Sequence, residues 1–431
     1  MRFVARAGGA VALALAVVPA APAQAASPST DGNNNRIACN TEALKDAIDN
    51  ANTKRGGTIE LAHDCRYVLT APDLLGGANG LPFITTPITL HGGKGTVVER
   101  STAPGTAQFR IFEVAGPAGF LTLDDLTVRN GHTTGDGGAV LVDPGRTLLL
   151  RSVTLTNNRA DGSGGAVQSN DGRVILHASK VDGNTAGDAG DGGGIAAAGG
   201  VLSVDSSTVT RNRAGVTGGG IAAGDALVTI SRSNVDRNRA GADGGGIASS
   251  GHLTLRSSHV DRNTAAEGGG INNLGTARIE HSSVVGNVAS GSGGGVQNEG
   301  TMTISHGSIN GNTSTQEEGG GIHNTGDVWI ARSLIKDNVA DDEGGGLWNS
   351  GSATAESSDI IGNRAGTTGG GVHNVDGTTV LTDSTVVKNE AADSGGGIFE
   401  ASGEVTLNRT RVKDNQPDNC RPVGAVTGCL D

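Results

Sequence analysis

The sequence predicts an all-β fold, a right-handed parallel β-helix solenoid of eleven or more coils with an N-terminal capping helix. The first reason is a repeat, because nine triple glycines follow one another at intervals of 24 to 26 residues from Gly192 onward. The second is that each repeat, such as residues 268–290, contains three short runs of alternating apolar and polar residues, which is typical of strands. The third is composition, because 73 of 431 residues are Gly and only nine are Phe, Trp or Tyr, too few for an ordinary globular core.

Residues 1–25 are expected to be a secretory signal peptide. Arg2 and Arg6 precede an apolar stretch over residues 10–18, and an A-x-A cleavage site follows at 23–25. The stretch is too short to cross a bilayer, and no later segment reaches the roughly 20 apolar residues that a membrane helix needs. We therefore expect a secreted, extracellular protein without a membrane span.

An N-terminal cap and irregular first coils are predicted for residues 26–130. Within this region, residues 41–52 are expected to form an amphipathic helix with Thr41 as its N-cap. Its apolar face consists of Leu44, Ala47, Ile48 and Ala51. The helix would cover the first coil, whose open edge would otherwise pair with other strands. A disulfide between Cys39 and Cys65 is expected to fasten it, because export permits disulfides and the four cysteines fall as one pair near each end.

Residues 131–415 are predicted to be the regular repeats, and residues 416–431 a C-terminal cap closed by a Cys420–Cys429 disulfide. One asparagine recurs in every repeat, so stacked coils would form an inward ladder of amides that bond to the copies above and below. The ladder residues are Asn158, Asn184, Asn212, Asn238, Asn263, Asn287, Asn312, Asn338, Asn363, Asn389 and Asn415. A column made mostly of hydroxyl residues stands five positions before this ladder. A second asparagine column consists of Asn273, Asn298, Asn324, Asn349 and Asn374.

The motifs resemble a known group of proteins. The helix followed by GGTIELA, then FRIFEV, LTLDDLTVRNG and the serial GGGIxN and TVxxN units, is similar to secreted bacterial right-handed parallel β-helix repeat proteins of the pectate-lyase-like superfamily. The GGAV motifs at 137–140 and 164–167 and the VxxN motifs also resemble the GGAI and FxxN repeats of chlamydial polymorphic outer-membrane proteins. The resemblance implies the β-helix fold. It leaves the function open, because the superfamily includes polysaccharide lyases, glycoside hydrolases, epimerases and adhesins.

The best candidate ligand-binding surface is the row of residues that follow the inward aliphatic residue after each glycine turn. Stacked coils would make consecutive row members neighbours, and outward aromatic rings would offer stacking faces to sugars. The predicted ligand-binding residues are Asn272, Gln297, His323, Trp348, His373 and Phe399. Earlier members of the row are Leu141, Gln168, Ala196, Ala222 and Ala248. The alternative is an ordinary surface row in which Trp348 packs on its neighbours.

Acidic residues precede the glycine turns, and five of them crowd two adjacent coils. These five are Glu317, Glu318, Asp341, Asp342 and Glu343. Solvated turn charges are the preferred interpretation, and the alternative is a Ca²⁺ site, because this hard cation prefers clustered oxygen ligands. Calcium is the one cofactor that the sequence leaves open. If the chain is an enzyme, the candidate general acids and bases are Glu318, Glu343, His323 and His373.

Arginines cluster around the ladder asparagine of three successive repeats. They are Arg211, Arg213, Arg237, Arg239 and Arg262. We expect salt bridges to Asp236, Asp243 and Asp261, and the alternative is capture of an anionic glycan by the guanidinium groups. Nucleic acid is not an expected partner, because 32 Lys and Arg against 44 Asp and Glu give a formal net charge of −12.

The sequence favours a secreted, adhesin-like protein that binds an extracellular polysaccharide or a cell-surface glycan without turnover. The regular repeat spacing leaves no inserted catalytic loop, which favours binding over catalysis. One alternative is a polysaccharide lyase or glycoside hydrolase that acts on an extracellular glycan, including uronate-containing ones. Another alternative is a purely structural wall or matrix protein. The oligomeric state is open, with a monomer as the default.

Overall fold

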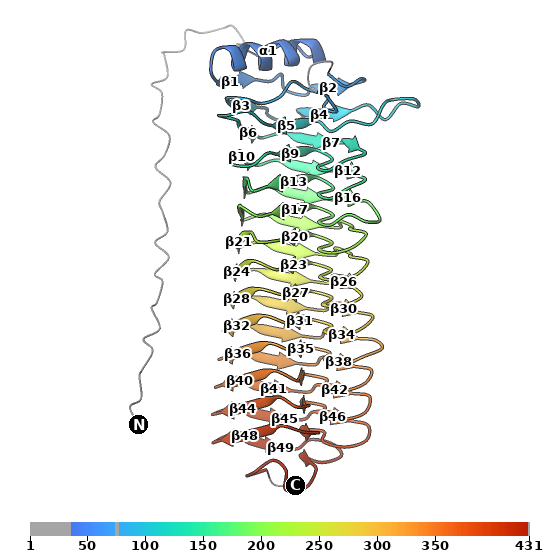
Figure 1. The fold of residues 1–431 in the computed structure, drawn as a ribbon, viewed down its shortest axis with the longest axis vertical. Helices are drawn as coiled ribbons and strands as arrows, with labels where there is room; N and C mark the ends of the chain where they lie inside the picture. The colour runs from blue at the N-terminus through green and yellow to red at the C-terminus, as the bar shows by residue number, and fades with distance from the viewer. Residues whose placement is uncertain (1–35, 74–76, 430–431) are drawn as a thin grey trace, which may run out of the picture. The chain divides into compact units, whose positions relative to one another are not determined.

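The computed structural model describes residues 36–73 and 77–429, which form an all-β solenoid with one short helix near the N-terminus. The coils follow one another in chain order from helix α1 (Thr41–Thr53) at one end to the C-terminal residues at the other (Figure 1). The predicted fold class is confirmed in these respects, and the right-handed sense of the winding stays a prediction. The predicted signal peptide, residues 1–25, lies outside the described residues.

Each regular coil has three strands, and most coils add a fourth, very short one. In one coil these are β27 (Ile271–Asn273), β28 (Thr276–Glu280), β29 (Ser283–Val285) and β30 (Val288–Ala289). The three longer strands agree with the sequence-based prediction, whereas the two-residue strand was not predicted. Only Ala289 of its two residues is buried, so the segment is too short to show a clear alternation in the sequence.

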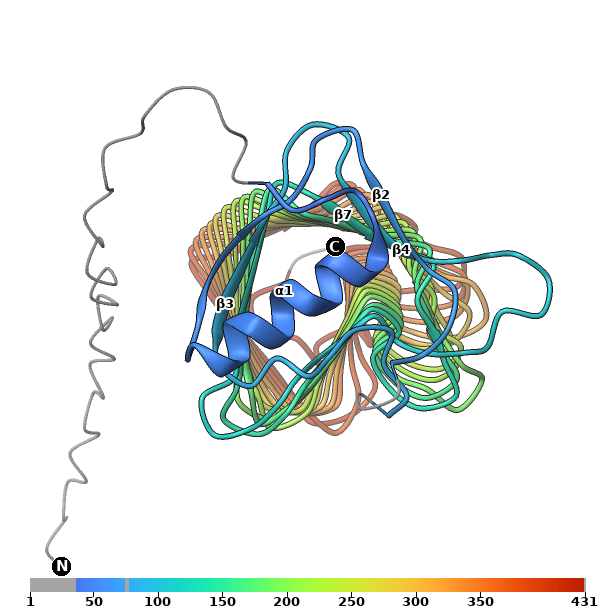
Figure 2. The same ribbon diagram turned by 90° about the horizontal axis from the view of Figure 1, so that it is seen from above.

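Strands of successive coils pair in parallel and build three long sheets. The first sheet has 14 strands, from β1 (Gly57–Glu60) to β48 (Glu404–Asn408), and the second has 14, from β2 (Arg66–Leu69) to β49 (Arg411–Lys413). Fourteen stacked strands confirm the prediction of eleven or more coils. The end view in Figure 2 shows the coils superimposed along the axis.

The third sheet carries the candidate site. Its 13 strands are, in order, β5 (Phe112–Val114), β9 (Val140–Val142), β13 (Val167–Asn170), β17 (Ile195–Ala198), β20 (Ile221–Ala223), β23 (Ile247–Ser249), β27, β31 (Val296–Asn298), β35 (Ile322–Asn324), β39 (Leu347–Asn349), β43 (Val372–Asn374), β47 (Ile398–Glu400) and β50 (Cys420–Arg421). The two-residue strands form two smaller sheets, one of three strands from β8 (His132–Thr133) to β16 (Thr185–Ala186) and one of six from β26 (Thr264–Ala265) to β46 (Glu390–Ala391).

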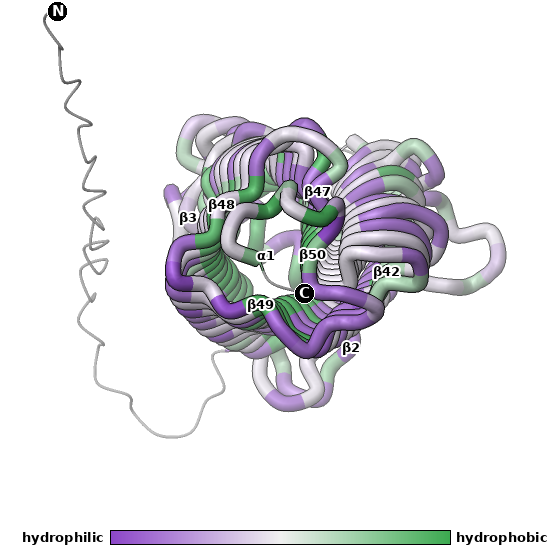
Figure 3. Tube along the Cα trace, turned by 90° about the horizontal axis from the view of Figure 1, so that it is seen from below, coloured by the Kyte–Doolittle hydropathy of each residue, from purple (hydrophilic) through white to green (hydrophobic). Residues whose placement is uncertain are grey.

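Aliphatic side chains fill the inside of the coil. In the coil that begins at β27, for example, Ile271 and Val284 are fully buried. Figure 3 shows hydrophobic residues along the inner wall and hydrophilic residues on the outer turns. The largest buried aromatic residues, Tyr67, Phe109 and Phe112, lie in the first coils, so the regular coils keep a core of aliphatic residues.

The asparagine ladder holds successive coils in register. Asn263 donates from its backbone N–H at 2.9 Å and from Nδ2 at 3.0 Å to Oδ1 of Asn287 in the next coil. Asn287 bonds in the same way to Asn312, and its Nδ2 also donates to the carbonyl oxygen of Val260. Each buried amide therefore satisfies backbone and side-chain groups of its neighbours at the same time.

The ladder runs from Asn158 to Asn415 and is closed at both ends. Asn419 accepts from the backbone and side chain of Asn415, and the Oδ1 of Asn158 accepts from the backbone N–H of Gly131. The predicted ladder is confirmed over all eleven of its members.

The hydroxyl column forms a second set of bonds between coils. The N–H of Ser258 donates to Oγ of Ser282 at 3.1 Å, and this Oγ donates to the carbonyl oxygen of Glu280 in its own coil. Gly307 interrupts the column, which resumes where its N–H donates to Oγ of Ser333 at 3.0 Å.

Steric constraints explain why the first two positions of the triple-glycine turn are glycine. Gly293 has φ of +67°, a left-handed conformation that favours glycine. Gly294 passes so close to the next coil that a Cβ atom would lie 2.5 Å from the carbonyl oxygen of Gly320. A side chain at the second position would therefore push neighbouring coils apart.

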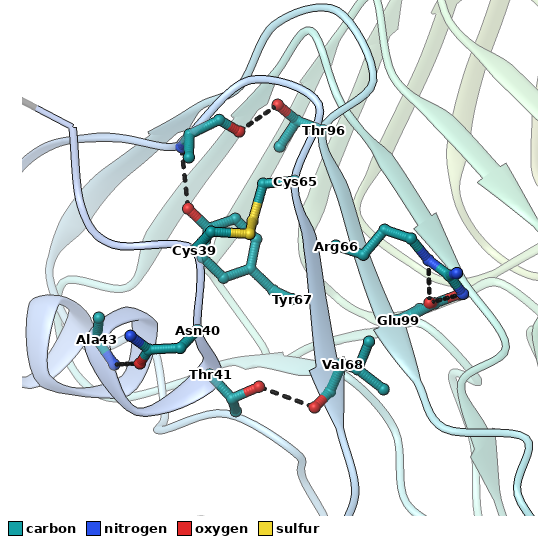
Figure 4. The surroundings of a disulfide bond; sticks show 11 residues. Cys39, Asn40, Thr41, Ala43, Cys65, Arg66, Tyr67, Val68, Thr96 and Glu99 are labelled. Atoms are coloured by element: carbon teal, nitrogen blue, oxygen red, sulfur yellow. Dashed lines mark hydrogen bonds and ion pairs between the residues drawn. A yellow bond between two sulfur atoms is a disulfide. The ribbon is translucent and has the colours of Figure 1, made fainter. Parts of the chain in front are cut away.

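Helix α1 covers the N-terminal end of the coil (Figure 2). Its apolar face is buried at Leu44, Ile48 and Ala51. The predicted N-cap is wrong by one residue. Asn40 caps the helix, because its Oδ1 accepts the N–H of Ala43 at 2.8 Å. Thr41 instead donates its hydroxyl to the carbonyl oxygen of Val68 in β2 (Figure 4).

Both predicted disulfides are present. Cys39 and Cys65 join the segment before α1 to the first coil with a Cα–Cα distance of 5.7 Å (Figure 4). Cys420 and Cys429 close the C-terminal segment with a Cα–Cα distance of 6.3 Å. The domain boundaries at residues 130 and 415 stay predictions. Within the part of the chain that the structure describes, no helix is long and apolar enough to cross a membrane.

Replacing Asn287 by Ala should lower the free energy of unfolding by about 3 kcal/mol, because several buried groups of the neighbouring coils lose their partners together. The groups include the backbone N–H and Nδ2 of Asn263 and the carbonyl oxygen of Val260. Urea denaturation followed by circular dichroism measures the change. Asn234→Ala is the matched control, since Asn234 is exposed on β22 (Asn234–Asp236). Equal stability of the two variants would contradict the structural role of the ladder.

Candidate ligand-binding groove

The predicted ligand-binding row lies on the outer side of the third sheet. Parallel pairing places its members directly opposite one another in consecutive coils. The paired sequence is Asn272, Gln297, His323, Trp348, His373 and Phe399. The expectation that the repeat makes these residues neighbours is therefore confirmed.

The expected exposure of this row is wrong for four of its six residues. Asn272, Gln297, His323 and His373 have exposed fractions of 3%, 5%, 8% and 1%. The reason is that the glycine turn of the same coil lies against the row. A Cβ atom on Gly344, for example, would lie 2.7 Å from the Cβ of Trp348.

The aromatic members of the row pack on one another. The rings of His323 and Trp348 stack with centroids 4.3 Å apart, and those of His373 and Phe399 with centroids 5.1 Å apart. Trp348 and Phe399 are partly buried. This part of the row is filled by its own side chains, so the alternative of Trp348 packing on its neighbours describes it well.

Glu343, at the start of its glycine turn, contacts two members of the row. Its Oε2 accepts a hydrogen bond from Trp348 Nε1 at 3.3 Å. The same oxygen lies 3.3 Å from Nε2 of His373, without hydrogen-bond geometry. Thr368 Oγ1 lies 2.9 Å from Nδ1 of His373, so the imidazole has polar neighbours at both nitrogens. The acidic row and the ligand row, which the sequence analysis treated separately, are thus neighbours in the structure.

Burial sets the protonation of this cluster. It lowers the pKa of His323 and of His373 to about 4, so both imidazoles are neutral at pH 7. Burial, together with the nearby Asp342 and Glu318 carboxylates, raises the pKa of Glu343, although the Trp348 hydrogen bond opposes this shift.

An open groove lies over the earlier part of the same row, where the side chains are alanines. It encloses about 250 Å³. Its floor consists of Gln168, Ala196, Ala222, Ala248 and Asn272. One wall consists of Ser163, Asp191, Thr217 and Asp243, which precede the glycine turns, and the opposite wall includes Ala198, Gly224, Ser250 and Leu274.

The two ends of the groove floor are amides. Gln168 donates from Nε2 to Oδ1 of Asn170 at 2.7 Å, whereas its buried Oε1 has no hydrogen-bond partner in the described residues. Asn272 makes no side-chain hydrogen bond within residues 36–73 and 77–429. The groove therefore has a floor of methyl groups between two amides with unused hydrogen-bonding capacity.

One carboxylate of the acidic wall, that of Asp191, is fixed by the neighbouring turn. Asp191 Oδ1 accepts from the backbone N–H of Thr217 at 3.0 Å and from its hydroxyl at 2.9 Å. Burial, with a smaller contribution from Glu299, raises the pKa of Asp243. Burial and the Asp243 carboxylate also raise the pKa of Glu267 in the next coil. A field of negative charge thus follows this side of the groove.

The predicted acidic cluster is spread along two coils. Ser292 Oγ donates to Glu317 and Glu318, at 2.8 and 3.1 Å, and Asp342 accepts from the hydroxyl of Thr367 at 2.8 Å. Among the described residues, no group of three or more His, Cys, Asp or Glu side chains is placed to hold one metal ion. The residues that the sequence offers as a Ca²⁺ site therefore contain no such group among the described side chains; they are Glu317, Glu318, Asp341, Asp342 and Glu343.

The arginine cluster lies on another side of the coil, at the corner after the second sheet. Arg237 pairs with Asp236 at 2.5 Å, and Arg262 lies 3.8 Å from the same carboxylate. Arg211 pairs with Asp182, a partner that the sequence analysis did not name. The expected pairing with Asp243 is wrong, because Asp243 lines the groove on the third sheet.

The groove was not predicted from the sequence. Ala196, Ala222 and Ala248 are predicted there only as earlier members of the ligand row, although three consecutive small residues between larger ones signal a gap. The opposite wall gave no comparable signal, because Ala198, Gly224, Ser250 and Leu274 share no residue type.

Acidification should destabilise the protein through His323 and His373. Each has a pKa of about 4 in the fold and an ordinary value of 6.5, so the unfolded chain binds more protons between these values. Their contribution is complete above pH 6.5 and is lost as the pH falls toward 4, by up to about 3 kcal/mol for each histidine. Urea midpoints at neutral pH and at about pH 4.5 measure the loss. The double variant His323→Gln and His373→Gln should lose less than wild type, whereas the exposed control His252→Gln should match wild type. A wild-type pH dependence in the double variant would refute this assignment.

Comparison with known protein families finds one match, over a short segment of the chain. A family model described as the Chlamydia polymorphic membrane protein repeat matches residues 152–170. This segment contains the GGAV motif at 164–167, so the predicted resemblance to these repeats is confirmed. No curated protein sequence matches the chain significantly.

Two solved structures are similar to the chain. The A-module of the mannuronan C-5 epimerase AlgE6 from Azotobacter vinelandii is 16% identical, with a TM-score of 0.38, and the match covers 87% of this chain and 96% of that chain. PfbA, a surface adhesin of Streptococcus pneumoniae, is 10% identical, with a TM-score of 0.34, and the match covers 86% of this chain and 89% of that chain. The chain described here is a parallel β-helix protein that carries a repeat of the chlamydial polymorphic-membrane-protein type.

Proposed function

We propose that the protein is secreted and binds an extracellular glycan without turnover, in the groove over β13, β17, β20, β23 and β27. The observation that carries the proposal is the groove of about 250 Å³ with a methyl floor and one polar wall. Methyl groups suit the apolar face of a sugar ring, and the amides and carboxylates around them suit its hydroxyl groups.

The position of the groove supports a polymer as the ligand. Its floor crosses five consecutive coils, so equivalent groups recur at the spacing of parallel strands, about 4.8 Å. The rest of the row, from Gln297 to Phe399, extends in line with the groove and is proposed to contact a longer glycan at the partly buried Trp348 and Phe399.

Catalysis is the second candidate function, and one observation favours it. The pKa of Glu343 is raised, and a general acid needs a carboxyl group that can hold a proton. Its Oε2 lies 3.3 Å from both Trp348 Nε1 and His373 Nε2. His323 and His373 are buried, however, so a substrate could reach the Glu343 carboxyl group but neither imidazole. We therefore place glycan binding first.

Replacing Ala222 by Leu should weaken glycan binding by about tenfold or more, because the larger side chain fills the centre of the groove. The measurement is retention of the full chain on a panel of extracellular polysaccharides, followed by titration calorimetry with the best binder. Ala392→Leu is the matched control, since Ala392 is exposed and lies near the C-terminal end.

The same incubations separate the alternatives. New reducing ends or unsaturated products that disappear in Glu343→Gln would support an enzyme and contradict binding without turnover. Retention that Ala222→Leu does not change would mean that the glycan binds elsewhere. No retention and no product would leave a purely structural role.

A further inference from the structure

The charge of the groove is one-sided. Two carboxylates, Asp191 and Asp243, stand in its wall, and the residues that line it include no Lys, Arg or His. Glu267 pairs with Asp243 from the next coil and so continues the acidic wall. A ligand in this groove therefore meets negative charge without any compensating cation from the protein.

A buried amide in the groove, that of Gln168, supplies an independent indication of a ligand. Gln168 and Asn272 have exposed fractions of 5% and 3%, and both line the groove. The Oε1 atom of Gln168 is buried and has no hydrogen-bond partner in the described residues. Buried polar atoms are normally paired, so a bound molecule with hydroxyl or amino groups would complete the hydrogen bonding of this amide.

We propose that the groove binds a glycan segment whose sugars carry amino groups. The proposal rests on the proposed function and specifies its ligand class. The ammonium groups lie against Asp191 and Asp243, the apolar sugar faces lie on the methyl groups of Ala196, Ala222 and Ala248, and hydroxyl groups bond to the amides at the two ends. Charge complementarity selects this class over neutral glycans.

The same charges exclude uronate-containing glycans from the groove. A uronate carboxylate would lose water beside two carboxylates of the same sign, with no guanidinium or ammonium group in reach. The basic surface pocket lies elsewhere, on the second sheet, and is lined by Lys180, Arg211 and Arg237. Its cations are already paired with Asp182 and Asp236.

The test compares oligomers of glucosamine, N-acetylglucosamine and galacturonate of equal length in calorimetric titrations of the full chain. The pH is one at which the glucosamine amines are protonated. Glucosamine oligomers should bind about tenfold or more tightly than N-acetylglucosamine oligomers, and added salt should weaken the former selectively. Equal or tighter binding of the N-acetylated or the uronate oligomers would overturn the proposal.

A pair of charge variants localises the effect. Asp243→Asn should lower the affinity for glucosamine oligomers about five- to tenfold, and should lower any affinity for N-acetylglucosamine oligomers by a smaller factor. Asp359→Asn should have no effect, because Asp359 is exposed on β41 (Asp359–Ile361), in the second sheet. Wild-type affinity of Asp243→Asn for glucosamine oligomers would overturn the proposal.

The Ala222→Leu variant distinguishes this proposal from the function on which it rests. If only neutral or uronate oligomers bind, and Ala222→Leu abolishes that binding, the groove is a glycan site and the amino-sugar assignment is wrong. If no oligomer or polysaccharide binds to the wild type, both proposals are wrong.

Discussion

The fixed register between coils is the constraint on which the rest of the structure depends. Backbone pairing alone would allow neighbouring coils to slip by two residues with little change in burial. The asparagine ladder opposes such a slip, because Oδ1 of Asn287 accepts two bonds from Asn263 and its Nδ2 donates to Asn312. A displaced coil would leave several buried polar groups unpaired at once, at a cost of about 1–3 kcal/mol for each group. Every row of outward side chains on the third sheet inherits its alignment from this network.

One aligned row produces two different surfaces. Alanines at 196, 222 and 248 leave space above the sheet, and the residues that precede the glycine turns become one wall of a groove. From His323 onward the same positions hold rings that stack in pairs and fill the equivalent space. Side-chain volume at a single position of the repeat therefore decides whether a coil contributes to an open groove or to a packed ridge. The backbone and the ladder are the same in both parts, so the binding surface can vary without a change in the fold.

The repeating parts of this structure can be predicted from the sequence, whereas the burial and the contacts of individual side chains cannot. The solenoid, the ladder from Asn158 to Asn415 and both disulfides follow from spacing and residue type, because each needs only the order of residues along the chain. Burial of His373 does not follow, since it depends on how closely the turn at Gly369 approaches the row. The N-cap at Asn40 was missed because two adjacent residues, Asn40 and Thr41, both suit that position and only the contact of Thr41 with Val68 separates them.

Because the groove is built from paired strands and turns, binding there would cost less conformational entropy than binding to a site made of loops. Its walls and floor belong to strands and turns whose backbone groups bond to the coils on both sides, as Thr217 does to Asp191 and as the turn at Gly244 does to Glu267. A ligand bound there as proposed would meet a surface that is already ordered, and little of its binding free energy would be lost in ordering the protein. The carboxylate of Asp191 is likewise held in place by Thr217 before a ligand arrives, so its repulsion of anions and attraction of cations are built into the resting structure. Selectivity by charge then needs no conformational change, only the difference in free energy between an ammonium and a carboxylate beside the same wall.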